Sequence, residues 1–360
     1  MKPRLFRRTP RLGRGSCRAA TPPAVLGLGL RAGGGGPGSA SPAAGRRLQQ
    51  RSARHFLTVS DLTREELGAL FRTAARVKRR PSAGRAALAG KTVALVFQKP
   101  SMRTRVAFEV AVLQLGGSVV YLGQDDIQLG LREPVKDVAR ALSRYVDGIV
   151  VRTFSHENAV EFAAYAAIPV INGLSDLVHP CQALADLFTL QETFGRLKGL
   201  RLAYVGDGNN VLHSLLEGCA LFGVRVAVAT PSRYRPDPAI WKAASRQAAA
   251  HGGSLRWDAD PRRVMRKADA VYTDVWVSMG QERERARRLR AFAPYQLNRA
   301  LLGQAPRGCR VMHCLPAHRG EEITDEVMES PRSVIFDQAE NRLHVQKALL
   351  MMLLGTKGSR

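Results

Sequence analysis

"TVALVFQKPSMRTRVAFEVAVLQLGGSVVYLG" (residues 92–123) contains the patterns of a strand, a helix and a second strand in succession. Its first six residues form a short apolar run that is typical of a buried strand. Apolar residues such as Val106 and Leu113 then recur at helical spacing over 102–115, and two glycines end the pattern. The run at 118–123 predicts a second strand. A strand, a crossover helix and another strand together predict one unit of a parallel sheet.

Short apolar runs alternate with longer helical patterns along the rest of the chain, as in parallel sheets that helices cover on both faces. We therefore expect an α/β fold with two doubly wound parallel-sheet domains joined by bridging helices. The expected domains are residues 55–190, completed by a C-terminal helix at 339–355, and residues 191–338. A bridging helix is expected near 189–199. Further strands are expected at 148–154, 168–173, 200–208, 224–230, 268–276, 309–316 and 333–338, and further helices at 134–145, 209–222 and 237–251.

Length and composition limit the class of protein. A chain of 360 residues can bury a large core. No apolar stretch reaches the about 20 residues that cross a bilayer, so we expect a soluble protein that contacts no membrane. The five cysteines are scattered and form no CxxC pair, which favours neither a disulfide framework nor a cysteine zinc site. We therefore expect a reducing compartment and no metal.

The formal net charge of +25 is unevenly distributed. Residues 1–54 hold 12 Lys and Arg and no Asp or Glu, so about half of the excess charge lies there. This segment lacks periodic apolar residues, and we expect it to be disordered. It could be a transit peptide for the mitochondrial matrix or a plastid, a tail without a role, or the product of a start site placed too early. We favour a cytoplasmic protein.

The segment that follows the first strand has the features of an anion site. Ser101 is a suitable N-cap for the helix of 102–115, and it leaves backbone N–H groups free at the positive end of that helix. Together with Arg103 and Thr104 these donors suit a phosphate group. A capped helix with solvated arginines would give the same pattern, so this motif needs support from other strand ends. Lys99 is expected only to raise the local positive potential.

Two further predicted strand ends carry polar groups. Arg152 ends the apolar strand "GIVV", and "HPCQ" (179–182) places His179 and Gln182 at the start of another helix. A salt-bridged arginine and a structural histidine would each explain one of these features. However, ligands of doubly wound sheets bind beyond the carboxyl ends of the strands. The three groups of donors therefore predict a single anion-binding crevice.

The second predicted domain carries a different set of groups. "GDGNN" (206–210) lacks the third glycine of a dinucleotide loop, and no acidic residue ends the next strand, so we expect no nicotinamide cofactor. Asn210 offers a neutral amide to a polar substrate. Asp274, beside a glycine-containing loop, could hold an ammonium group or cap a helix. Cys314, after His313, is either an inert buried thiol or a thiolate that accepts a proton.

Six motifs together resemble the aspartate/ornithine carbamoyltransferase family. They occur in the order found in that family and span residues 56 to about 355. Met102 stands where the commoner family motif has threonine, which is tolerable if that position contributes its backbone N–H group. The motifs are "SMRTR" (101–105), "HPCQ" (179–182), "GDGNN" (206–210), "DVWVSMG" (274–280), "HCLP" (313–316) and "AENR" (339–342).

The resemblance implies transfer of a carbamoyl group from carbamoyl phosphate to L-ornithine, which gives L-citrulline and phosphate in arginine biosynthesis. It implies no cofactor, and a homotrimer with active sites at subunit interfaces. It implies catalytic roles for Arg103, Arg152, His179, Asp274 and Cys314. It places carbamoyl phosphate against Ser101, Met102, Arg103, Thr104, Gln128, Arg152, His179, Pro180, Cys181 and Gln182, with Gln128 lent to a neighbouring subunit. It places ornithine against Asn210, Asp274, Ser278, Met279, Cys314, Leu315 and Arg342.

Three other functions remain as alternatives. A carbamoyltransferase for aspartate, putrescine or N-acetylornithine would use the same first domain. A nucleic-acid-binding protein would depend on the basic N-terminal segment, but the cations form no stripe with interleaved aromatic residues. A nicotinamide-dependent dehydrogenase would need the dinucleotide loop that "GDGNN" fails to match.

Overall fold

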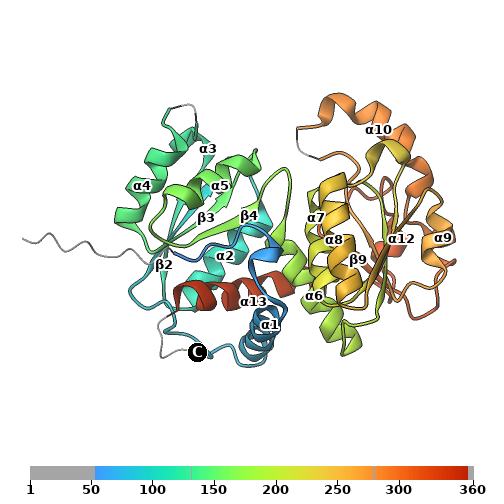
Figure 1. Cartoon of the computed structure of the whole chain (residues 1–360), viewed down its shortest axis with the longest axis horizontal. Coiled ribbons are helices and arrows are strands. Elements are labelled where there is room, and N and C mark those ends of the chain that lie inside the picture. The colour runs from blue at the N-terminus through green and yellow to red at the C-terminus, as the bar shows by residue number, and fades with distance from the viewer. Residues whose placement is uncertain (1–52, 131, 279, 356–360) are drawn as a thin grey trace, which may run out of the picture. The chain divides into compact units, whose positions relative to one another are not determined.

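Two separate parallel sheets with helices packed against them confirm the predicted fold class (Figure 1). This computed structural model describes residues 53–130, 132–278 and 280–355, and these residues belong to one compact unit. The expected disorder of residues 1–54 concerns a segment that lies almost entirely outside the described residues. Among the described helices, none combines the length and the apolar character that crossing a bilayer requires.

The first sheet has four strands in the order β2-β1-β3-β4, all parallel. In its register, Phe97 at the end of β1 pairs with Arg152 at the end of β3, so these two strand ends lie side by side. The strands are β1 (Thr92–Phe97), β2 (Ser118–Leu122), β3 (Gly148–Arg152) and β4 (Val170–Leu174). The helices of this half are α1 (Arg64–Arg79), α2 (Met102–Gln114), α3 (Gln124–Ile127), α4 (Val135–Tyr145), α5 (His156–Tyr165) and α6 (Pro180–Phe194), after the 3-10 turn η1 (Val59–Asp61).

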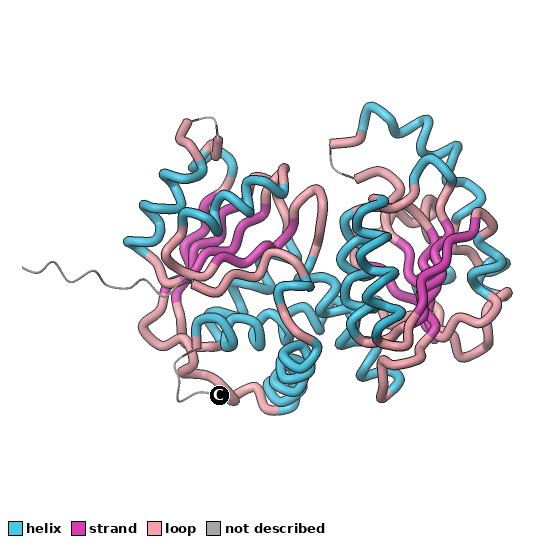
Figure 2. The backbone as a smooth tube through the Cα atoms, in the orientation of Figure 1, coloured by secondary structure: helices cyan, strands magenta, loops and turns pink. Residues whose placement is uncertain are grey.

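The second sheet has five parallel strands in the order β7-β6-β5-β8-β9. Figure 2 draws the strands of both sheets in magenta, with the helices in cyan. Its strands are β5 (Arg201–Val205), β6 (Arg225–Ala229), β7 (Ser254–Asp258), β8 (Ala270–Thr273) and β9 (Arg310–His313). Its helices are α7 (Asn210–Leu221), α8 (Pro238–Ala250), α9 (Pro261–Met265), α10 (Arg285–Phe292), α11 (Arg299–Leu302) and α12 (Asp325–Met328), with 3-10 turns η2 (Ser232–Tyr234), η3 (Glu282–Glu284) and η4 (Ala293–Tyr295).

Two predictions about this half were wrong. The strand expected at 333–338 is absent from the sheet: Ser333 makes one isolated bridge to Val311, and α13 (Ile335–Leu354) begins two residues later. The apolar run there is too short to separate a strand from a helix start by its period. The edge strand β7 was missed, because "SLRWD" is partly exposed and carries no apolar run.

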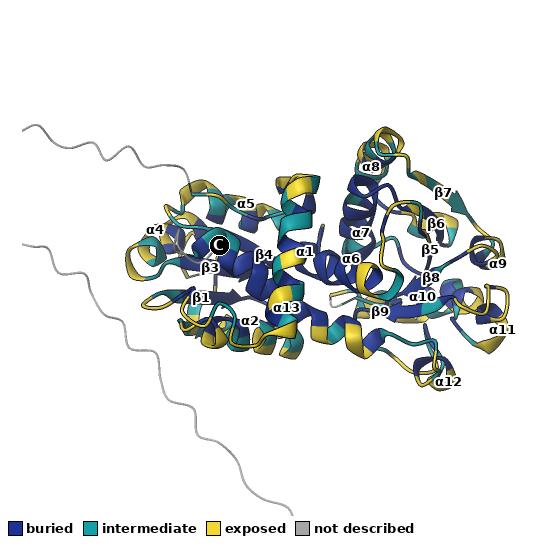
Figure 3. Cartoon of the chain, turned by 90° about the horizontal axis from the view of Figure 1, so that it is seen from below, coloured by how far each residue is buried: buried dark blue, intermediate teal, exposed yellow. Residues whose placement is uncertain are grey.

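The last helix, α13, returns to the first half of the chain and packs against α1, α2 and α6. Gln338, Asn341 and Arg342 are buried on it, although helix surfaces usually keep such side chains in water. Figure 3 shows the deep burial of α6, whose residues from Pro180 to Leu190 are all buried. The bridging segment predicted at 189–199 is the end of α6, which stops at Phe194. We propose, from this packing, that residues 339–355 complete the domain of residues 55–190.

Candidate active site

A cavity of about 880 Å³ lies at the carboxyl ends of both sheets and is lined by residues from nearly every predicted motif. Its volume is in the range of small-molecule sites in enzymes. Of the predicted site residues, twelve line it: Ser101, Met102, Arg103, Thr104, Arg152, His179, Asn210, Asp274, Ser278, Cys314, Leu315 and Arg342. Segments that are far apart in the sequence therefore meet in one crevice.

The N-terminus of α2 forms one wall of this cavity. Ser101 caps the helix as predicted, and its Oγ accepts a hydrogen bond from the N–H group of Thr104 at 3.3 Å. No acidic residue lies in the first turn of α2, so nothing within that turn neutralises the positive end of the helix. The segment thus has the local geometry of an anion site, with Arg103 partly buried beside it.

Three guanidinium groups gather at this wall. Arg103 follows Ser101, Arg152 ends β3, and Arg342 reaches in from α13; all three line the cavity. Burial and the nearby positive charges of Arg342 and Arg103 lower the pKa of Arg152 to about 10. Burial also lowers the pKa values of Arg103 and Arg342. Mutual repulsion of this kind is relieved by an anion placed among the three groups.

Buried donors at this wall remain without acceptors. Nε of Arg152, Nε of Arg342 and Nδ1 of His179 have no hydrogen-bond partner among the described residues. Burial, and then the charges of the arginines, lower the pKa of His179 well below its usual value, so this imidazole is neutral at pH 7. A neutral imidazole can donate a hydrogen bond to a carbonyl oxygen without adding a fourth positive charge.

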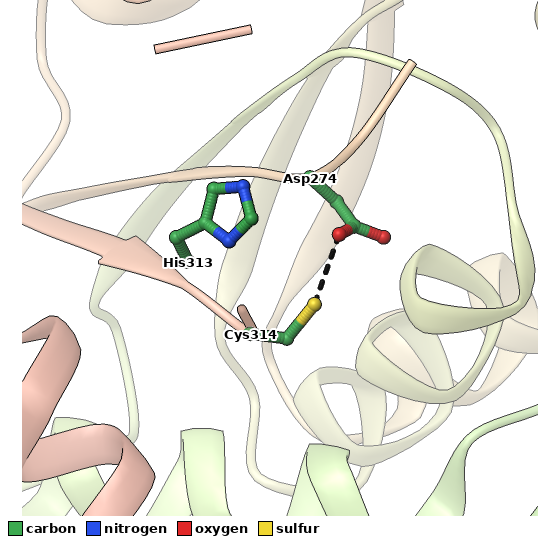
Figure 4. A group of neighbouring side chains, drawn as sticks. All are labelled: Asp274, His313 and Cys314. Atoms are coloured by element: carbon green, nitrogen blue, oxygen red, sulfur yellow. Dashed lines mark hydrogen bonds between the residues drawn. The ribbon is translucent and has the colours of Figure 1, made fainter. Parts of the chain in front are cut away.

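The opposite wall carries a carboxylate and a thiol (Figure 4). Asp274 follows β8, and its two oxygens accept hydrogen bonds from Cys314 Sγ at 2.9 Å and from Asn209 Nδ2 at 2.6 Å. Burial, and then the negative charge of Asp274, raise the pKa of Cys314 well above its usual value. This arrangement therefore disfavours the thiolate, which was one of the two alternatives for Cys314. Cys314 is a thiol that donates to Asp274.

Asp274, His313 and Cys314 lie close enough together to be considered as ligands of a metal ion. Ligand atoms of Asp274, His313 and Cys314 lie within 4.8 Å of one another. However, His313 Nδ1 accepts the N–H group of Leu315 at 2.8 Å, and Nε2 lies 3.1 Å from Glu322 Oε1. With both ring nitrogens engaged, the histidine offers no lone pair to an ion beside the thiol. The possible ligand atoms of His318, Glu321 and Glu322 also lie within 4.8 Å of one another.

Five predicted site residues are not placed at the cavity. Pro180, Cys181 and Gln182 are buried behind it on α6, and Gln128 lies beyond α3 in a left-handed conformation with φ of 40°. Met279 lies outside the described residues. The side chain of Gln182 is already satisfied: its Nε2 donates to Asp186, and its Oε1 accepts from Arg342. The roles expected for these five residues stay predictions.

Sequence reasoning missed several residues of the cavity wall. Lys99, expected to be a flanking charge, lines the cavity and is 8% exposed, with its Nζ 4.6 Å from the ring centre of Phe154. Asp207 and Arg288 form a buried ion pair that also lines it. A lysine two residues after a buried strand was a usable signal for Lys99. The partner of Asp207 lies 81 residues away, and no local pattern predicts it.

A buried polar network connects the two walls. Arg342 donates to Thr104 Oγ1 at 2.8 Å and to Gln182 Oε1 at 2.5 Å. Asp186 Oδ1 accepts from Gln182 at 2.8 Å and from Gln338 at 2.6 Å, and Gln338 Oε1 accepts the N–H group of His313 at 3.0 Å. The chain of hydrogen bonds therefore runs from the helix start at Thr104 to the strand end that carries the thiol.

Two doubly wound domains with a cationic crevice facing a carboxylate–thiol wall define a class of enzyme that joins an anionic donor to a second small substrate. The comparisons with known proteins identify the family. Residues 54–192 match the carbamoyl-P binding domain of aspartate/ornithine carbamoyltransferases, and residues 198–353 match their Asp/Orn binding domain. The chain belongs to the aspartate/ornithine carbamoyltransferase family.

Individual relatives agree with that assignment. The ornithine carbamoyltransferase of Thermococcus kodakarensis is 52% identical over 306 residues, which cover 84% of this chain and 97% of that protein. The corresponding protein of Gloeobacter violaceus is 55% identical over 300 residues, covering 83% and 95%. The solved structure of ornithine carbamoyltransferase from Pyrococcus furiosus has a TM-score of 0.82 at 50% identity and covers 84% of this chain and 97% of that one.

Asp186 gives a prediction about pH. Burial raises its pKa to about 7, although hydrogen bonds from Gln182 and Gln338 act in the opposite direction. An unfolded aspartate has a pKa of about 3.9, so the folded protein keeps a proton that the unfolded chain releases between about pH 4 and pH 7. The stability that this proton confers is complete below about pH 4 and is lost as the pH rises through 7. Asn cannot titrate, so the free energy of unfolding of Asp186→Asn should rise relative to wild type between pH 5 and pH 8.

Urea denaturation of both proteins at the two pH values measures this difference. Other groups whose pKa values are raised, such as Asp207 and Glu217, are present in both proteins and cancel in the comparison. A difference in stability that is equal at pH 5 and pH 8 would contradict the assignment of the titration to Asp186.

Proposed function

We propose that the chain is an ornithine carbamoyltransferase, which converts carbamoyl phosphate and L-ornithine to L-citrulline and phosphate. The observation that carries the proposal is the cluster of Arg103, Arg152 and Arg342 around the N-terminus of α2, which lines the same cavity as Asp274. Relatives that share half of its residues over nearly their whole length are ornithine carbamoyltransferases, which supports the choice of the amine.

We assign the phosphate to the cationic wall. Its oxygens would accept hydrogen bonds from the backbone N–H groups of residues 102 and 103, from the hydroxyl groups of Ser101 and Thr104, and from the guanidinium of Arg103. Met102 is 67% exposed, and its side chain has no polar atom suited to a phosphate, so it would contribute its backbone N–H group. The carbamoyl oxygen would lie at Arg152 and His179, which both line the cavity.

The neutral δ-amine of ornithine would attack the carbamoyl carbon. A bond forms between that nitrogen and the carbon, the carbonyl oxygen becomes an oxyanion, and the C–O bond to phosphate then breaks. Arg103, Arg152 and neutral His179 would stabilise the negative charge on the oxyanion and on the departing phosphate, which is usually the largest contribution to such catalysis. The amine proton must leave during this step.

We place ornithine between the two sheets, with its reacting amine toward the cationic wall. Asp274 and Ser278 would hold the ammonium group at the other end of the substrate, and the amide of Asn210 would face its polar atoms. Asn210 Nδ2 already donates to the carbonyl oxygen of Ser175 at 2.6 Å, so its Oδ1 is the atom left for substrate. Because Cys314 is a thiol bonded to Asp274, this carboxylate would bind the ammonium end of ornithine, and the proton of the reacting amine would leave with the departing phosphate.

We further propose a homotrimer in the cytoplasm. Four apolar side chains on α2 and β2 support an interface there: Met102, Val106, Leu113 and Val120 are between 43% and 67% exposed. Large apolar side chains exposed on neighbouring elements are typical of surfaces that bind protein. Gln128, which lies next to these elements in sequence and away from the cavity of its own chain, would enter the site of a neighbouring subunit.

The function is tested by the product formed. The full chain should convert carbamoyl phosphate and L-ornithine to L-citrulline and phosphate. Putrescine, N-acetyl-L-ornithine and L-aspartate, assayed at equal concentrations, should react much more slowly. Colorimetric detection of the ureido product together with free phosphate measures each reaction. A clear preference for another amine would refute the choice of ornithine, and the absence of any ureido product would refute the transferase.

The phosphate site is tested at Arg103. Arg103→Ala should lower kcat by about 10²- to 10³-fold, as loss of an electrostatic donor to a developing anion does. Arg105→Ala is a matched control, because Arg105 lies two residues further on, pairs with Glu109 and stacks over Tyr121 outside the cavity. Circular dichroism checks that both variants fold. Near-normal turnover of Arg103→Ala would contradict the phosphate site.

The assembly is tested by light scattering of the full chain, which should give three times the chain mass of 39.3 kDa. Leu113→Asp places a charge on the proposed interface, so it should shift the mass toward that of one chain and lower activity in parallel. Tyr145→Asp, at a side chain that is 77% exposed on α4, is the control. A monomeric wild-type protein with full activity would refute the proposed trimer.

A further inference from the structure

Glu322 is a buried carboxyl group with no part in the reaction described above. It lies in the loop between β9 and α12, is 0% exposed and does not line the cavity. Its Oε1 lies 3.1 Å from His313 Nε2 and accepts the N–H group of His318 at 2.5 Å. Among the described residues, its titratable basic neighbours within 4.0 Å are these two histidines and no Lys or Arg. Burying a carboxylate without a lysine or arginine beside it costs free energy, so the position of Glu322 beside His313 suggests a role for this pair.

The contact fixes the proton of His313. The N–H group of Leu315 donates to His313 Nδ1 at 2.8 Å, so Nδ1 carries no proton. A neutral imidazole then has its proton on Nε2, which donates to Glu322. Without an acceptor at Nε2, the opposite tautomer would be equally available, and its Nδ1–H group would meet the N–H group of Leu315. Glu322 therefore selects the tautomer that can bind the backbone.

That backbone bond holds an unusual turn. Leu315 has a φ of 60°, in the left-handed region that side chains other than glycine rarely adopt. The ring of His313 bridges the turn, and Gln338 holds the backbone N–H group of the same histidine at 3.0 Å. Between the two bonds lies Cys314, whose thiol reaches Asp274. Any rotation of the turn would move both the thiol and Leu315, which line the cavity.

We propose that Glu322 is a positioning residue for the transferase, acting through His313 to hold the turn of Cys314 and Leu315 against Asp274. The inference rests on the proposed function, because that function places the ammonium end of ornithine at Asp274, against which this turn is held. Glu322 touches neither substrate in this scheme. Glu322 acts by fixing the position of groups that contact substrate, and a displacement of such groups by about 1 Å can lower the rate by about 10²-fold.

Three substitutions separate the possible causes. Glu322→Ala removes the acceptor. Glu322→Asp keeps the charge but is one methylene too short to reach the histidine ring. Glu322→Gln loses the charge, but its Oε1 can still accept from both His313 Nε2 and the backbone of His318. Glu326→Ala, at an exposed position on α12, is the matched control.

We expect Glu322→Ala and Glu322→Asp to lower kcat by about 10²-fold and to raise KM for L-ornithine, while KM for carbamoyl phosphate stays within about twofold of wild type. Glu322→Gln and the control should retain most of the activity. A residue that served stability alone would lower the melting temperature and leave kcat and both KM values unchanged. That result would overturn the proposal.

A second readout needs no catalytic activity. Alkylation of Cys314 by iodoacetamide, followed by mass spectrometry, should be at least tenfold faster in Glu322→Ala and Glu322→Asp, because the turn no longer holds the thiol against Asp274. Cys309, buried before β9, is the internal control and should not change. This measurement separates failure of the positioning role from failure of the proposed function. If Glu322→Ala does not fold, Glu322→Asp decides, and wild-type rates of alkylation and turnover in that variant would refute the proposal.

Discussion

The candidate site depends on the buried guanidinium of Arg342. This side chain comes from the last helix, yet it donates to Thr104 and to Gln182, which lie 238 and 160 residues earlier in the sequence. Through Gln182 it is linked to Asp186 and then to Gln338, which returns to α13 itself. The helix start at Thr104, the helix α6 and the strand end at His313 are therefore held by one connected set of polar groups. Loss of any buried member would leave its neighbours without partners, at about 1–3 kcal/mol for each group.

This arrangement has an electrostatic cost that the sequence alone does not reveal. Arg103, Arg152 and Arg342 lie close enough that the charges of Arg342 and Arg103 depress the pKa of Arg152, and no carboxylate of this wall neutralises them directly. Asp186, which could do so, is buried, and its pKa is raised to about 7. The neutral state of His179 limits the repulsion. A dianion bound here would be attracted to all three arginines and would offset the repulsion among them. The repulsion in the ligand-free protein therefore increases the affinity of this wall for a dianion.

Much of the fold follows from short patterns, and the errors have clear physical causes. Strands such as Thr92–Phe97 and Gly148–Arg152 are continuous apolar runs because parallel strands are covered on both faces. The edge strand Ser254–Asp258 carries no such run, since one of its sides meets no other strand. At Ile335 the first turn of α13 has the local composition of a strand, and only the packing of the helix against distant helices decides between the two.

Site residues could be predicted where a polar side chain lies at the end of a strand. They could not be predicted where their role depends on a side chain far away in the sequence. Ser101, Arg152 and Asp274 each follow a recognisable strand, so the rule for doubly wound sheets brings them together. Gln182 was expected at the ligand, but its two polar ends are taken by Asp186 and Arg342, pairings that only the tertiary structure creates. The same holds for Asp207 with Arg288.

The contrast between the two walls shows how one fold serves two substrates. The wall at the start of α2 gathers three guanidinium groups in the cavity, whereas the wall of β8 and β9 pairs its acid with internal donors, Cys314 and Asn209. An anion at the first wall would meet these three positive charges. An amine must compete with Cys314 and Asn209 for the carboxylate of Asp274, and its binding therefore changes the hydrogen bonding of the thiol. Binding of the amine would thus loosen the hydrogen bond between Cys314 and Asp274. The left-handed turn at Leu315 would limit how far the Cys314 side chain then moves.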